Sequence, residues 1–163
     1  MKSTLKKIIL FVLFPVLSFA QTETFNLYHP EADAKAEVNA AVKKAAAEHK
    51  HVLLMIGGNW CKWCRIFDKF QHSNYAVDSA LNNNFVFQHV NYSKENKNSE
   101  LLTELEFPQR FGFPVFVVLN EKGQRIHTQN SAYLEKGEGY EVEKVVEFLD
   151  QWRYGALKAE NYK

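Results

Sequence analysis

Apolar residues recur along the chain at two spacings, and each spacing predicts a different kind of element. Within residues 33–50, Ala34, Val38, Ala41 and Ala45 follow one another at intervals of three or four, with charged residues between them. This period places one apolar stripe along a helix. The same reasoning predicts further helices over residues 61–71, 99–105 and 141–152, and a short one that begins at a capping Asn74.

Four short runs lack this period and are predicted as strands. Residues 51–56 are continuously apolar from Val52, which is typical of a strand buried on both faces, and two glycines end the run. Residues 85–91 predict a second strand, and residues 115–119 and 124–128 predict a hairpin closed by a turn at 121–123. The resulting order of helices and strands predicts an α/β fold with helices on both faces of a mixed sheet.

The first twenty residues have the three parts of a secretory signal. Three lysines precede an apolar run over residues 8–19, and the small residues Ser18 and Ala20 stand before Gln21. The run is shorter than the ~20 apolar residues that span a bilayer. We therefore expect a signal peptide over residues 1–20; an uncleaved membrane anchor is the alternative.

Length and charge narrow the classes of protein that remain. The chain has 163 residues and a formal charge of +1, which becomes −2 once the three lysines of the signal are removed. Without a basic excess, neither a nucleic-acid partner nor binding to an anionic membrane surface is expected. We also expect no stable membrane insertion after signal cleavage. We expect an extended segment over residues 21–32, one domain over 33–154, a tail over 155–163, and a periplasmic or secreted location.

The strongest local signal is the pair Cys61 and Cys64, which follows a strand and two glycines and opens a predicted helix. Free backbone N–H groups and the helix dipole favour an anion there, so the thiolate of Cys61 is stabilised, and Lys62 adds a positive charge. The spacing lets Cys64 reach back one turn and close a disulfide. Cys61 is expected to attack, and Cys64 to resolve the mixed disulfide.

Three alternative roles for the pair fit the sequence less well. A structural disulfide over two intervening residues closes too small a loop to stabilise much. A zinc site needs two more ligands, and the six histidines show no paired ligand spacing. Haem attachment needs a histidine after the second cysteine, where Arg65 stands. The sequence therefore predicts a redox pair with no metal and no organic cofactor.

The sequence resembles the thioredoxin superfamily in three places: residues 52–64, residues 112–118 and Gly123. They are most similar to its exported members related to the disulfide-interchange reductant domain, over about residues 34–152. The resemblance implies a thioredoxin-like fold with a central mixed sheet of about four strands.

The resemblance also implies roles for particular residues. Pro114 corresponds to the family's cis-proline beside the cysteines, and Phe113 would present its backbone to a bound peptide. Trp60 would pack beside the site. Trp63 would form either an apolar wall that partners touch or a shield over Cys64.

The sequence departs from the family in two places. Lys62 and Trp63 replace the common Gly-Pro between the cysteines, so the redox potential does not carry over. Met55 stands where the family often has a buried acid that accepts the proton of the resolving cysteine. His89, near that position on the second strand, is a hypothetical proton-transfer group, with an ordinary strand histidine as the alternative.

Together these observations predict an exported thiol–disulfide oxidoreductase, with a reductant or isomerase favoured. Its partners would be protein thiols and disulfides and a thiol redox protein. The alternative is a thioredoxin-fold binding module whose cysteines rest as a disulfide while Trp60, Trp63 and Phe113 hold a partner.

Overall fold

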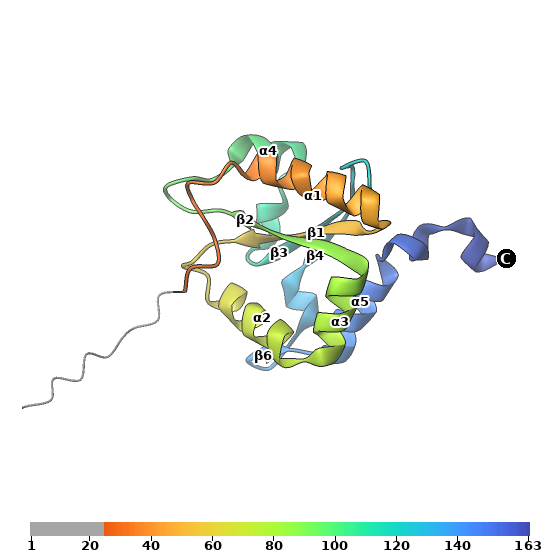
Figure 1. The fold of residues 1–163 in the computed structure, drawn as a ribbon. Coiled ribbons are helices and arrows are strands. Elements are labelled where there is room, and N and C mark those ends of the chain that lie inside the picture. Colours follow the sequence, from red (N-terminus) through yellow and green to blue (C-terminus); the bar gives the residue numbers. More distant parts are fainter. Residues whose placement is uncertain (1–24) are drawn as a thin grey trace, which may run out of the picture.

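The computed structural model describes residues 25–163, and the signal peptide expected over residues 1–20 lies outside them. A four-stranded sheet stands between two layers of helices (Figure 1). Its strands lie in the order β2-β1-β3-β4, with β1 parallel to β2 and the other two pairs antiparallel. The strands are β1 (His51–Gly57), β2 (Phe85–Asn91), β3 (Val115–Leu119) and β4 (Arg125–Asn130).

Alternation along the central strands separates the core into two parts. In β1, Leu53 and Met55 join one apolar cluster, whereas Val52, Leu54 and Ile56 join the other. Helices α2 (Lys62–Ser73), α3 (Tyr75–Asn84) and α5 (Val142–Gln151) cover the first face. Helices α1 (Ala34–Glu48) and α4 (Ser99–Glu104) cover the second. The continuous apolar run of β1 is explained by this burial on both sides.

The predicted order of the helices and of the four main strands is confirmed, with the following differences. Asn74 precedes α3, but its side chain makes no cap for that helix and instead donates to the carbonyl of Phe70 at 2.7 Å. A second, two-stranded sheet was not predicted: β5 (Glu135–Lys136) and β6 (Gly139–Tyr140) form a small hairpin beside α2. The last residues form two short 3-10 helices, Tyr154–Leu157 and Ala159–Tyr162.

The residues before α1 form an arm, residues 25–32, that passes around one end of the sheet (Figure 1). Tyr28 is buried in the cluster under α2, whereas Ala34 belongs to the cluster under α1. The arm therefore crosses from one face to the other, past the end of β1 that leads into the cysteine pair. Within residues 25–163, no helix is both long and apolar enough to cross a membrane.

Candidate active site

The two cysteines form a disulfide at the start of α2. The Cα atoms of Cys61 and Cys64 are 5.3 Å apart. Cys61 is the N-cap residue of the helix, and its sulfur accepts a hydrogen bond from the backbone N–H of Cys64 at 3.1 Å. The predicted reach of one helical turn is confirmed. The first sulfur therefore lies where unpaired N–H groups and the helix dipole favour a thiolate.

The two sulfurs differ in their access to solvent. Cys61 retains 3% of its surface, whereas Cys64 is completely buried in the cluster that contains Met55 and Phe67. An incoming thiol or disulfide therefore meets Cys61 first. Lys62, between them in sequence, is exposed in the first turn of α2.

Three aromatic rings lie next to each other beside the pair. The ring of Phe113 contacts Trp60 edge to face, with centroids 5.3 Å apart, and stacks on Tyr92 at 4.8 Å. The Trp60 indole N–H donates to the carbonyl of Tyr92 at 2.8 Å, which fixes its orientation although the side chain is 55% exposed. Sequence reasoning found Trp60 and Phe113 but missed Tyr92, which follows β2 and carries no local signal.

Trp63 packs against a different set of residues from these rings. It is half-buried, lies against the apolar cluster and contacts Tyr140 edge to face at 5.7 Å. The Tyr140 hydroxyl donates to the Trp63 carbonyl at 3.4 Å, so β6 supports the first turn of the helix.

Pro114 is buried immediately before β3, and the peptide bond between Phe113 and Pro114 is cis. Gly112 precedes this bond with a φ of 87°, a conformation that side chains with a Cβ rarely adopt. No hydrogen bond within residues 25–163 uses the backbone N–H or carbonyl of Phe113. This backbone is therefore free to pair with another chain.

The structure places His89 directly beside Met55, as neighbours in the register of β1 and β2. Burial, and to a smaller extent the nearby positive charges of His72 and His29, lower the pKa of His89 to about 4. The imidazole is therefore neutral at ordinary pH. Its ring contacts those of Phe87 and Tyr28, at 4.8 and 5.4 Å.

Tyr28 and Asn59 are two site residues that sequence reasoning missed. The Asn59 side-chain oxygen accepts from the backbone N–H groups of Leu27 and Tyr28, both at 3.0 Å, and its amide donates to the Tyr28 carbonyl at 2.8 Å. Asn59 stands just before Trp60 in sequence, so the arm is attached to the loop that carries the cysteines. The position of Asn59 just before the cysteine motif could have suggested a role at the site, but the sequence does not show that it binds the backbone of residues 27 and 28.

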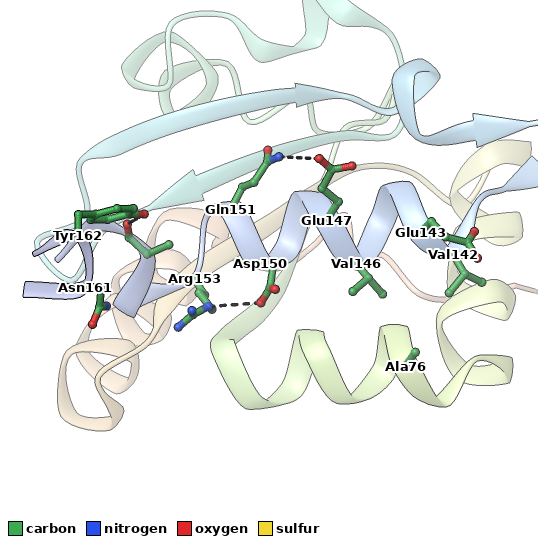
Figure 2. Close-up of a pocket in the computed structure, with 11 residues that line it drawn as sticks. Ala76, Val142, Glu143, Val146, Glu147, Asp150, Gln151, Arg153, Asn161 and Tyr162 are labelled. Atoms are coloured by element: carbon green, nitrogen blue, oxygen red, sulfur yellow. Dashed lines mark hydrogen bonds and ion pairs between the residues drawn. The ribbon is translucent and has the colours of Figure 1, made fainter. Parts of the chain in front are cut away.

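Outside this site, the described part of the molecule has no cluster of metal ligands but does have an open hollow. Among residues 25–163 no group of three His, Cys, Asp or Glu side chains is arranged to hold a metal ion. An open hollow between α3, α5 and the C-terminal residues is lined by Ala76, Val146 and Tyr162, among others (Figure 2). None of the expected site residues lines that hollow.

Comparison with known proteins assigns the family. Residues 33–121 match the family model described as Thioredoxin-like. The chain belongs to the Thioredoxin-like family. A thiol:disulfide interchange protein DsbD from Pectobacterium atrosepticum is 30% identical over 115 residues, which are 70% of this chain. This chain spans about a fifth of that relative's length, because the match covers 19% of it.

Solved structures of other Thioredoxin-like proteins agree with the fold. A disulphide isomerase from Xylella fastidiosa Temecula1 is 26% identical with a TM-score of 0.67, over 77% of this chain and 95% of its own. The oxidised C-terminal domain of DsbD from Neisseria meningitidis is 25% identical with a TM-score of 0.54; the match covers 73% of this chain and 96% of that domain. These relatives are disulfide oxidoreductases by name, and this member of the family has its Cys-x-x-Cys pair at disulfide distance.

Proposed function

We propose that the protein is an exported thiol–disulfide oxidoreductase that acts on protein disulfides through Cys61. The observation that carries this proposal is the disulfide at the start of α2, in which Cys61 caps the helix and retains slight exposure while Cys64 is buried. A buried, fully enclosed pair inside a helix would not react; a pair at a helix start is suited to exchange.

In the reductive direction the thiolate of Cys61 attacks a substrate disulfide. The substrate's S–S bond breaks, one substrate sulfur leaves as a thiolate, and the other is joined to Cys61. The thiolate of Cys64 then attacks the Cys61 sulfur and displaces the second substrate thiolate. Two electrons pass to the substrate, and the enzyme is left as the Cys61–Cys64 disulfide that the structure contains.

The substrate is expected to lie as an extended peptide against Phe113 and Pro114. The unused backbone groups of Phe113 support this placement, because an extended peptide binds by adding its own hydrogen bonds to such a free edge. Trp60 would cover the peptide on one side. Trp63 would border it on the other, and the charge of Lys62 would favour the Cys61 thiolate.

The favoured direction is reduction or isomerisation, supported by similarity to an interchange protein and a disulphide isomerase. We expect export by the signal over residues 1–20, action in the periplasm or outside the cell, and a thiol redox protein as electron donor. Equilibration with glutathione should give a potential near that of thioredoxin, about −270 mV. A value near about −120 mV would indicate an oxidant instead.

Two cysteine variants test the mechanism. Cys61→Ser should abolish reduction of insulin disulfides, whereas Cys64→Ser should accumulate a mixed disulfide with the substrate. Retained activity in Cys61→Ser would refute the role of Cys61. If the wild-type protein binds peptides but shows no turnover and no mixed disulfide, the binding-module alternative is correct.

A further inference from the structure

The buried hydroxyl of Tyr28 is one feature that the proposed mechanism does not use. Tyr28 is 1% exposed and belongs to the same apolar cluster as Cys64. Its oxygen makes no hydrogen bond within residues 25–163. A buried hydroxyl without a partner costs free energy, so its retention points to a role in another state of the protein.

Gly57 shows how close this hydroxyl is to the resolving sulfur. A Cβ built on Gly57 would lie 2.4 Å from the sulfur of Cys64 and 2.8 Å from the hydroxyl oxygen of Tyr28. The two atoms therefore flank the same small space, which is open only because residue 57 has no side chain. In the disulfide state they make no hydrogen bond to each other.

The position of Tyr28 is held by the loop that carries the cysteines. Asn59 makes three hydrogen bonds to the backbone of Leu27 and Tyr28, between 2.8 and 3.0 Å. The aromatic ring also contacts the ring of His89 edge to face, with centroids 5.4 Å apart. The hydroxyl is thus built into the site rather than carried past it by a mobile arm.

Opening of the disulfide creates the need for a donor at this place. When a partner thiolate attacks Cys61, the bond between the two cysteine sulfurs breaks and its electron pair goes to Cys64. A thiolate in a fully buried, apolar environment is strongly disfavoured unless a hydrogen bond stabilises it. Met55, in the same cluster, offers neither a donor nor a charge.

We propose that the hydroxyl of Tyr28 donates a hydrogen bond to the Cys64 thiolate when the disulfide opens and again when that thiolate attacks Cys61. No proton leaves Tyr28 in either step: the phenol remains a donor, and the electron pair moves only between sulfur atoms. The inference rests on the proposed exchange function. Within it, Tyr28 contacts a reacting atom, and Asn59 is the positioning residue that holds it there.

The charged and titratable groups near Tyr28 are compatible with a permanent donor. They are Asp68 on α2, Tyr140 on β6, His89 on β2 and His29 on the arm, with Arg65 over the ring of Phe25. Burial, and then the nearby Tyr140 and Asp68, raise the pKa of Tyr28 above its ordinary value. The hydroxyl therefore keeps its proton at any pH at which the protein works.

The first test measures the pKa of the Cys64 thiol directly, in a Cys61→Ser background, from its thiolate absorbance. Tyr28→Phe removes only the unpaired oxygen and should raise this pKa by about 1 to 2 units, the effect of losing one hydrogen bond to a charged group. Tyr140→Phe is the matched control, because it removes a second buried phenol of the same cluster, whose hydroxyl is directed to the Trp63 carbonyl. It should leave the Cys64 pKa unchanged.

A second pair of measurements separates an effect on the reaction of Cys64 from a loss of folding stability. Tyr28→Phe should melt no lower than wild type, since no hydrogen bond is lost, while its release of substrate from the mixed disulfide should slow at least tenfold at neutral pH. Asn59→Ala should shift the Cys64 pKa in the same direction, and combining it with Tyr28→Phe should add nothing. An additive double variant would remove Asn59 from the proposal.

The outcomes distinguish this inference from the proposed function. If wild-type protein reduces disulfides and Tyr28→Phe leaves both the Cys64 pKa and the release rate unchanged, the donor role is overturned and the exchange function stands. If wild-type protein has no turnover but the Cys64 pKa responds to Tyr28→Phe, the hydrogen bond is supported and the exchange function fails.

Discussion

Gly57→Ala tests the close packing on which the site depends. The new methyl group would lie 2.4 Å from the Cys64 sulfur and 2.8 Å from the Tyr28 oxygen, both well inside van der Waals contact. Neither atom can move freely, because the sulfur is held by the disulfide and Tyr28 by Asn59. Overpacking of this kind costs about 1–3 kcal/mol.

Two measurements follow from that magnitude. At about 3–5 °C per kcal/mol for a domain of this size, thermal unfolding of the oxidised protein should shift downward by roughly 3–15 °C. In the reduced protein the S–S bond no longer fixes the position of the Cys64 sulfur, whereas the contact with Tyr28 is the same in both states, so the strain at the sulfur falls mainly on the disulfide. The reduction potential should then rise by about 20–60 mV, since 30 mV corresponds to about 1.4 kcal/mol.

Gly123→Ala is the matched control. Gly123 has a φ of 78°, so alanine is strained there, but its Cβ would lie 3.5 Å from Val42 and far along the chain from the cysteines. This variant should lose about 1 kcal/mol of folding free energy, but its reduction potential should equal that of the wild-type protein. A Gly57→Ala protein with unchanged stability and unchanged potential would refute the close packing of Cys64 and Tyr28.

Three further predictions concern the residues around the disulfide. Trp60→Phe loses the 2.8 Å hydrogen bond to Tyr92; it should cost about 0.5–1 kcal/mol of stability and raise KM for peptide disulfides severalfold. An unchanged KM in steady-state assays would place the peptide elsewhere. Lys62→Glu should raise the Cys61 pKa by about half a unit, seen as slower alkylation at neutral pH, and an unaltered rate profile would contradict this. For His89, the folded pKa of about 4 lies below the ordinary 6.5, so the unfolded chain binds more protons between these values and stability falls as pH drops through them. In His89→Leu the free energy of unfolding should no longer fall by about 3 kcal/mol between neutral pH and pH 4. If the two proteins show the same pH dependence of unfolding, burial does not perturb this imidazole.

The predictions that succeeded rest on local information. The helical period of apolar residues located the helices, and short apolar runs without that period located the four strands of the main sheet, because both patterns report which faces of an element are buried. The cysteine pair was recognised for the same reason: its spacing and its place after a strand are properties of consecutive residues. The β5–β6 hairpin escaped notice because two-residue strands are too short to show a period.

Asn74 illustrates a limit of local rules. Its residue type and position predict a cap for α3, yet its amide pairs with a carbonyl at the end of α2. Both partners lie within four residues of Asn74, so the sequence does not distinguish between them. His89 shows a similar limit: the strand register places it beside Met55, but burial makes it neutral and its ring packs against Tyr28.

The sequence by itself determined the order of elements, the two-faced burial of β1 and a pair of cysteines at a helix start. Only the tertiary structure decided what surrounds the second sulfur. Tyr28 and Cys64 lie in separate segments joined by no repeating pattern, and they meet because the arm passes the end of β1 and Asn59 holds it there. Spacing along a chain specifies which face of an element is apolar, whereas contacts between distant segments depend on how those faces pack.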